Sequence, residues 1–137
     1  MTTKERYVSY EIAKLLKEKG FAWRVFNFYD EHGGFSEHIG SVYSLYNWNY
    51  PTKDEYGSQY CSAPTQQMAC DWLTEEKGLY ISVVPDFNEY GDYPDDLYWF
   101  ARVYDLKNGD YIHSTKLCAG SQEAFETALE YCLKNIA

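Results

Sequence analysis

The sequence lacks both the long apolar run that a membrane span needs and the excess of positive charge that nucleic-acid binding needs. No stretch of its 137 residues approaches roughly 18–20 consecutive apolar residues, and the first residues, MTTKERYVSYE, contain no apolar core of a signal peptide. Lys and Arg total 12 against 21 Asp and Glu, a formal net charge of −9. Because this charge repels phosphates, we expect no direct nucleic-acid binding, no membrane association and a cytoplasmic location.

The sequence also lacks metal-binding cysteine patterns and catalytic signatures. Cys61, Cys70, Cys118 and Cys132 are spaced as in no zinc site and no CxxC pair. Without an export signal we predict four free, mostly buried thiols in a reducing compartment. No nucleophile elbow, phosphate-binding loop, dinucleotide fingerprint or HExxH is present. We therefore predict a protein that is not an enzyme and that uses no cofactor and no metal ion.

Two local arrangements keep catalysis or metal binding open as weaker alternatives. Cys61 precedes a predicted helix, and thiols near helix N-termini can have lowered pKa values, as a nucleophile needs. His32 and His38 flank a Gly-Gly turn, so they could meet across a hairpin and bind a metal ion together with a neighbouring glutamate. Polar residues beside a turn need no such role.

Hydrophobic periodicity and turn residues predict a two-layer α+β domain over residues 1–137. Apolar residues at helical spacing predict three helices, and alternation between turn signals predicts about five strands. Hairpin signals dominate, so the sheet is expected to be mostly antiparallel with the helices on one face. The predicted order is α-β-β-α-β-β-β-α, with helices at 9–20, 63–78 and 121–136 and strands at 21–30, 39–50, 79–87, 97–106 and 111–117. Pro85 either ends the third strand or places it at a sheet edge.

Two turn signals place hairpins within this order. Gly33 and Gly34 are free to adopt positive φ between the first two strands. Asn108-Gly109 favours a two-residue type I′ turn between the last two strands.

Aromatic residues are abundant, with 15 Tyr, 7 Phe and 4 Trp, or 19% of the chain. In the segment YNWNY, Tyr46, Trp48 and Tyr50 would share one face of a strand. This row could be the sheet face beneath the helices, because sheets favour aromatic residues. It could also be a platform that stacks on a sugar or base or anchors a protein partner. We take these three residues as candidate binding residues.

An acidic loop is the second candidate for binding. Asp86, Glu89, Asp92, Asp95 and Asp96 fall within eleven residues. The spacing does not fit an EF-hand, because a proline interrupts the run and no glutamate closes it. A solvated loop is the better interpretation, and Asp92, Asp95 and Asp96 are candidates for contact with a partner.

Three blocks of the sequence carry a resemblance to a known family. YVSYEIAKLLKEKGF, SAPTQQMACDWLTEEKGLYISV and SQEAFETALEYCLKNIA together resemble a family of small uncharacterised proteins from gut Bacteroides-type bacteria and their phages and mobile elements. The family's C-terminal EEA-like signature is matched only in part, by Glu123-Ala124-Phe125. The resemblance implies a cytosolic accessory protein, and it implies no activity.

These observations predict a non-enzymatic protein that binds a protein partner through an acidic, aromatic-rich surface. One such mechanism is occupation of a basic site on a nucleic-acid-binding protein, where carboxylates replace phosphates. The alternative is a small-molecule or carbohydrate-binding module that uses the aromatic row as a platform.

Overall fold

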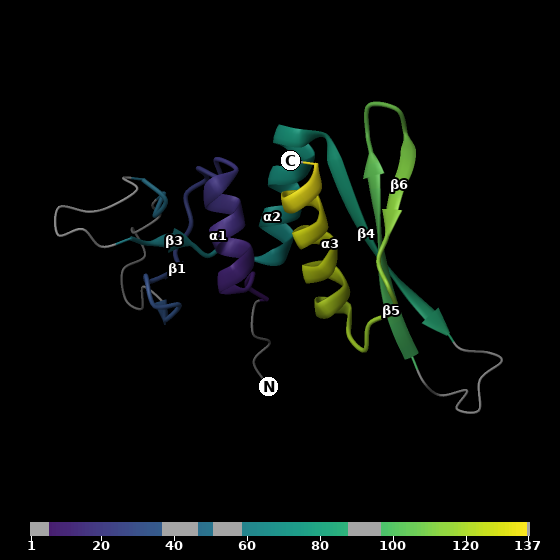
Figure 1. Cartoon of the computed structure of the whole chain (residues 1–137), viewed down its shortest axis with the longest axis horizontal. Helices are drawn as coiled ribbons and strands as arrows, with labels where there is room; N and C mark the ends of the chain where they lie inside the picture. Colours follow the sequence, from purple (N-terminus) through teal and green to yellow (C-terminus); the bar gives the residue numbers. More distant parts are fainter. Residues whose placement is uncertain (1–5, 37–46, 51–58, 88–96, 137) are drawn as a thin grey trace. The chain divides into compact units, whose positions relative to one another are not determined.

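The computed structural model describes residues 6–36, 47–50, 59–87 and 97–136 (Figure 1). The chain forms two compact units, Met1–Ala69 and Cys70–Ala137, and the boundary falls within helix α2 (Gln66–Trp72). The α+β class is confirmed, and the elements follow in the predicted order with one short strand added. The expected single sheet of about five strands is instead two antiparallel sheets of three described strands, one in each unit. That all of it is a single domain stays a prediction.

The first helix of the first unit, α1 (Tyr10–Glu18), forms where its capping residues predict it. The Ser9 hydroxyl accepts a hydrogen bond from the Ile12 N–H at 3.2 Å, and Gly20 follows the helix with φ of 93°. Ile12, Ala13 and Leu16 are buried along one side. The amphipathic spacing therefore gives this helix its buried side.

The sheet of the first unit consists of three short strands in the order β2-β1-β3. The predicted hairpin around Gly33-Gly34 is confirmed, because β1 (Phe28–Tyr29) pairs antiparallel with β2 (Phe35–Ser36). On its other side β1 pairs with β3 (Cys61–Ser62), a strand that the sequence did not predict.

The predicted strand over 21–30 is wrong for most of its length, because only its last part, β1, is in the sheet. Side chains occupy the carbonyl groups that a neighbouring strand would need. The Phe21 carbonyl accepts from Asn49 Nδ2 at 2.8 Å, and the Val25 carbonyl accepts from Trp48 Nε1 at 3.0 Å. These bonds satisfy two carbonyl groups without a strand neighbour, in a segment where Val25 forms only an isolated bridge.

The turn between β1 and β2 gives a stability prediction. Gly33 has φ of 83°, and a Cβ added there would lie 3.0 Å from the Tyr10 ring. Gly33→Ala is therefore expected to lower the free energy of unfolding by more than the roughly 1–2 kcal/mol that positive φ alone costs an alanine. Gly20→Ala is the matched control, since Gly20 has φ of 93° but open space around it. Urea unfolding of both variants measures the difference, and equal losses would contradict the contact with Tyr10.

The predicted second helix is confirmed as two consecutive parts. The α-helix α2 begins after Thr65, whose hydroxyl accepts from the Met68 N–H at 3.1 Å. It continues as a π-helical segment, η1 (Leu73–Lys77), and Gly78 ends it in the left-handed conformation with φ of 67°. Glycine at this position is the expected stop.

The second unit is a three-stranded sheet with a long helix on one face. Strands β4 (Leu79–Phe87), β5 (Leu97–Asp105) and β6 (Asp110–Ser114) pair antiparallel in the order β4-β5-β6. Helix α3 (Ser121–Asn135) packs on β4 and β5, as Figure 1 shows. The residues buried on the helix and on the facing strands are small or aliphatic, and they include Ala101, Val103, Ala128, Leu129 and Leu133.

The β5–β6 hairpin is confirmed, but its predicted type I′ turn is wrong. Four residues, Leu106–Gly109, connect the strands, and Gly109 has positive φ whereas Asn108 does not. The Asp105 carboxylate accepts from the Lys107 N–H at 2.9 Å, and the Asp105 carbonyl accepts from the Gly109 N–H at 2.8 Å. This cap by the Asp105 side chain stabilises the four-residue turn. The prediction of a two-residue turn was based on Asn108-Gly109 alone and did not include Asp105.

Candidate functional site

The segment Asn47–Tyr50 is a turn, so the predicted strand is wrong at these residues. The Tyr50 N–H donates to the Asn47 carbonyl at 3.2 Å, the pattern of a β-turn. Side chains in a turn do not alternate between two faces, so Trp48 and Tyr50 do not share a strand face. Tyr46 lies outside the described residues. The role of all three as binding residues stays a prediction.

The side chains of Trp48 and Asn49 connect this turn to other residues of the first unit. The Trp48 ring lies 4.3 Å from the Phe28 ring, centroid to centroid. The Asn49 side chain accepts from the Ser62 N–H at 2.9 Å while its amide donates to the Phe21 carbonyl. Tyr50 is 79% exposed. The motif is therefore a structural anchor whose last ring is open to solvent.

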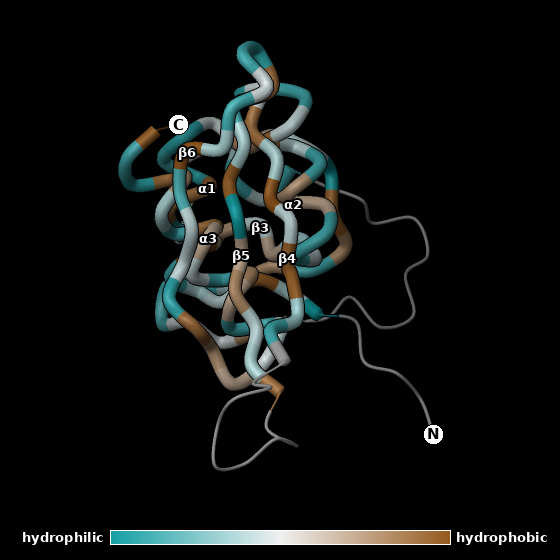
Figure 2. The backbone as a smooth tube through the Cα atoms, turned by 90° about the vertical axis from the view of Figure 1, so that its right-hand side faces the viewer, coloured by the Kyte–Doolittle hydropathy of each residue, from teal (hydrophilic) through white to brown (hydrophobic). Residues whose placement is uncertain are grey.

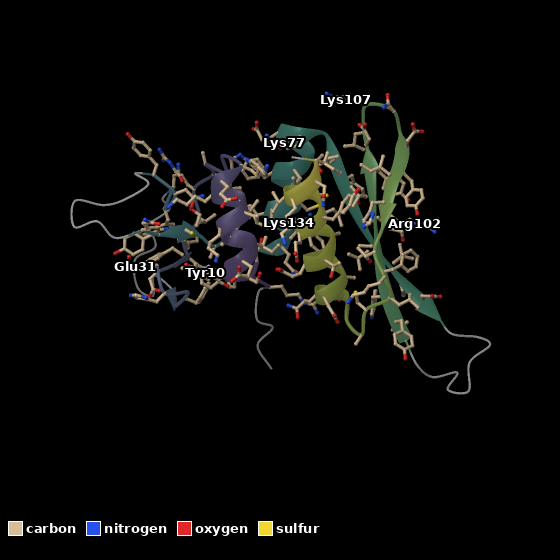
Figure 3. The ribbon with its side chains drawn as sticks, viewed as in Figure 1. Tyr10, Glu31, Lys77, Arg102, Lys107 and Lys134 are labelled. Carbon is tan, nitrogen blue, oxygen red and sulfur yellow. The ribbon has the colours of Figure 1, made fainter. Side chains whose placement is uncertain are left out.

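A cavity of about 400 Å³ in the first unit is lined by Tyr10, Lys17, Glu31 and Cys61, among others. Figure 3 labels Tyr10 and Glu31, and the Tyr10 hydroxyl donates to the Glu31 carbonyl at 3.1 Å. Burial raises the pKa of the Cys61 thiol, although Lys17 acts in the opposite direction. Cys61 belongs to β3, and α2 begins only at Gln66. The raised pKa runs against the alternative of a catalytic Cys61, which needs a lowered one.

The remaining thiols have the same character. All four cysteines are free and buried, which confirms that prediction. Burial raises the pKa of Cys70, and it raises the pKa of Cys132 to about 12. No group of three or more His, Cys, Asp or Glu side chains within the described ranges could hold a metal ion, and His38 lies outside those ranges.

The β1–β2 turn gives a pH prediction. The Asp30 carboxylate accepts from the Gly34 and His32 N–H groups, both at 2.8 Å, and these bonds lower its pKa. Its contribution to stability is thus fully present above the ordinary pKa of about 3.9 and is lost as the pH falls through the lowered value. The difference in free energy of unfolding between the protein and Asp30→Asn should stay constant near neutral pH and shrink in acid. Urea unfolding across this range measures it, and a constant difference down to the lowest pH would contradict the prediction.

The sheet of the second unit has a second side, which we call the outer face, opposite α3. Pairing places Tyr80 beside Tyr104, Ser82 beside Arg102, and Val84 beside Phe100. Figure 2 views this side of the strands, and Figure 3 shows Arg102 on the side away from α3. The outer face consists of Tyr80, Ser82, Val84 and Asp86 on β4, Tyr98, Phe100, Arg102 and Tyr104 on β5, and Tyr111 and Ser114 on β6.

Aromatic rings dominate the outer face and remain open to solvent. Tyr80, Tyr98 and Tyr111 are 48%, 36% and 55% exposed. The Arg102 guanidinium lies over two rings, 5.2 Å from the centroid of Phe100 and 5.7 Å from that of Tyr111. Cation–π contacts of this length hold an arginine side chain against a surface. The face is therefore a set of exposed tyrosines around one positioned cation.

Carboxylates lie at one end of the outer face and, on the opposite side of the sheet, at the hairpin end. Asp86 pairs with Tyr98 at one end, and Asp105 lies directly opposite Asp110 at the hairpin end, beside the Tyr104–Tyr111 pair. Like charges in directly opposed positions repel each other. Cys70–Ala137 contains 13 Asp and Glu against 5 Lys and Arg, whereas Met1–Ala69 contains 8 against 7. The aromatic face thus belongs to the unit that carries nearly all the net negative charge.

The acidic candidates from the sequence belong to the same unit. Asp92, Asp95 and Asp96 occur between the end of β4 and the start of β5, in a segment that lies outside the described residues. In the chain this segment joins the two strands at the end where Asp86 pairs with Tyr98. Their contact with a partner stays a prediction.

Sequence reasoning missed the outer face, although a signal for it was present. In LYWFARVYD, Tyr98, Phe100, Arg102 and Tyr104 occupy alternate positions. An arginine in such a row marks its face as solvent-exposed, because a buried guanidinium needs a partner. The same row then identifies the exposed tyrosines.

Comparison with models of known protein families, with curated proteins and with solved structures finds no match. The resemblance to proteins of Bacteroides-type bacteria therefore stays a prediction. Within the part of the chain that the structure describes, no helix combines the length and apolar composition needed to cross a membrane.

Proposed function

We propose that this protein binds another protein, and that the outer face of β4-β5-β6 contacts a partner segment with net positive charge. The observation that carries the proposal is the cluster of exposed tyrosines around Arg102. Tyr and Arg are enriched among the residues that contribute most to binding energy at protein interfaces. Tyr80, Tyr98 and Tyr111 are exposed on this face.

The charge pattern supports a basic partner. Asp86, at one end of the outer face, forms no ion pair with any residue that the structure describes. A partner with lysines or arginines would have a counter-charge in Asp86 and would be steered by the net charge of the unit. The same charge opposes direct binding of nucleic acid.

Ring geometry favours a peptide over a sugar. The Tyr104 and Tyr111 rings are 6.3 Å apart and inclined at 58°. A carbohydrate stacks on rings that present one flat surface, whereas tilted tyrosines form pockets between side chains. The tilt therefore supports a partner with side chains that enter between the rings.

The chemistry of the thiols supports two further parts of the proposal, a cytoplasmic location and a non-enzymatic role. Four buried free cysteines, with raised pKa values at Cys61, Cys70 and Cys132, suit a reducing cytoplasm and supply no nucleophile. We therefore propose a cytoplasmic, non-enzymatic binding protein.

A defined peptide panel tests the proposal. Fluorescein-labelled peptides of about 15 residues would combine aromatic and aliphatic residues with either lysine and arginine or glutamate and aspartate at the same positions. We expect the basic peptides to bind with Kd below about 1 mM and to weaken as salt is added. A glycan panel is included, and it is expected to give no binding.

The matched variant Tyr98→Ser/Tyr111→Ser is expected to weaken binding of the tightest basic peptide by at least about 30-fold, the effect of losing one interface hot spot. Tyr50→Ser is the control, because Tyr50 is more exposed than either residue but lies in the other unit. The proposal is contradicted if no basic peptide binds, if glycans bind instead, or if Tyr50→Ser has the same effect.

A further inference from the structure

Arg102 has no anionic partner among the described residues of a strongly acidic unit. Its guanidinium contacts the rings of Phe100 and Tyr111, and it forms no ion pair and no hydrogen bond with any described residue. The five N–H donors of a guanidinium form a planar fork that matches an oxyanion. The two rings restrict the side chain, so less conformational entropy is lost when an anion binds.

Two hydroxyl groups lie in the same row of the sheet. Strand pairing places Ser82 of β4 on one side of Arg102 and Ser114 of β6 on the other. Directly opposed residues of adjacent strands have Cβ atoms about 4.5–5.5 Å apart. Neither serine forms a side-chain hydrogen bond with another residue in the described part of the chain. The N–H donors of Arg102 and the two serine O–H groups therefore lie on the same face of the sheet.

Aromatic side chains border this polar row on both sides. Tyr80, Tyr104 and Tyr111 lie toward the hairpin end, and Phe100 lies toward the other end. A ligand whose charged oxygens meet the polar row therefore places its carbon atoms against rings. We infer that the Ser82–Arg102–Ser114 row binds a carboxylate group carried by the partner segment. This inference rests on the proposed protein-binding function.

A carboxylate fits the row better than a phosphate does. A carboxylate carries one negative charge, whereas a phosphate monoester carries about −1.5 to −2 at neutral pH. The excess of 13 acidic over 5 basic residues in Cys70–Ala137 repels the second charge as well as the first, and only one cation lies in the row. A planar carboxylate also meets the guanidinium with two parallel hydrogen bonds.

Small carboxylates test this site without a known partner. The whole protein, labelled with 15N, would be titrated with N-acetylphenylalanine, which has a chain-terminal carboxylate, and with N-acetylglutamic acid N-methylamide, which has a side-chain carboxylate. The controls are N-acetylphenylalaninamide and N-acetylglutamine N-methylamide, which lack the charge. We expect saturable shifts of the Arg102 Nε–H and of the Ser82 and Ser114 amides, at about 10–100 mM probe. The probe that saturates at the lower concentration shows whether the site prefers a chain-terminal or a side-chain carboxylate.

Three variants define the role of the guanidinium. Arg102→Gln should abolish saturation, and Arg102→Lys, which keeps the charge but loses the fork, should weaken binding by about tenfold. Lys107→Gln, which removes a cation from the hairpin turn, should leave binding unchanged. Inorganic phosphate should bind more weakly than either carboxylate.

The inference is overturned if the amide controls give the same shifts as the carboxylates, if Lys107→Gln weakens binding as much as Arg102→Gln, or if phosphate binds more tightly. These results are distinguishable from failure of the proposed function. If the carboxylates fail while basic peptides still perturb the outer face, the carboxylate site is wrong and the protein-binding function stands. If the basic peptides fail as well, the proposed function is wrong and the inference fails with it.

Discussion

Replacing Asn49 with alanine is expected to lower the free energy of unfolding by about 2–4 kcal/mol, although Asn49 lies in a turn that is only partly buried. Its side chain accepts from the Ser62 N–H and donates to the Phe21 carbonyl. Both partner residues are almost completely buried. Each backbone group that loses its partner in such surroundings costs about 1–3 kcal/mol. Urea unfolding followed by tryptophan fluorescence measures the loss.

Tyr50→Ala is the matched control for this prediction. Tyr50 is adjacent in sequence, but its side chain is 79% exposed. Its replacement should change the free energy of unfolding by less than about 0.5 kcal/mol, as for other surface residues. Equal losses for the two variants would show that the turn as a whole, and not the Asn49 amide, stabilises the unit.

Val103→Asp is expected to unfold the second unit at room temperature. Val103 is fully buried on the side of β5 that faces α3. An unpaired carboxylate there costs several kcal/mol, a large part of the usual stability of a domain. Loss of dispersion in the amide spectrum of Cys70–Ala137 measures the effect.

The neighbouring substitution Arg102→Asp introduces the same side chain on the outer face. It should leave the unit folded and change its free energy of unfolding by less than about 1 kcal/mol, because the side chain is exposed. The pair of variants thus tests which side of the sheet is covered. A folded Val103→Asp protein together with an unfolded Arg102→Asp protein would show that the assignment of the two faces is reversed.

Periodicity in the sequence predicted the helices and the hairpins of this protein well. Ser9, Gly20 and Gly78 cap or end helices as their chemistry requires. These features are local, because a cap needs only the backbone beside it and a helix face needs only its own spacing.

Features that depend on distant partners were not predictable in the same way. YNWNY has the alternation of a strand, yet Asn49 and Trp48 satisfy carbonyl groups more than 20 positions earlier in the chain. Those bonds connect the turn at 47–50 to the segment 21–27, which lies outside the named strands. A hydrogen bond from a distant side chain, in place of one from a neighbouring strand, cannot be recognised from the hydrophobic pattern of the local sequence.

The candidate site shows the same contrast. The excess of tyrosine and acidic residues predicted an aromatic, acidic binding surface, but the residues chosen first, Trp48 and Tyr50, belong to the other unit. Side chains of β5 alternate between two rows, and one of these rows lies on the outer face. The sequence did not show which row is exposed, because this depends on α3 covering Ala101 and Val103.

Mapping the bound peptide by amide chemical shifts tests the central claim most directly. The 15N-labelled protein would be titrated with the tightest basic peptide of the panel. The proposal predicts that the largest shifts occur at residues of the outer face, with Tyr98, Arg102 and Tyr111 among them, and that they are lost in Tyr98→Ser/Tyr111→Ser. Shifts concentrated around Tyr10, Glu31 and the cavity of the first unit would contradict it, as would the absence of any saturable shift.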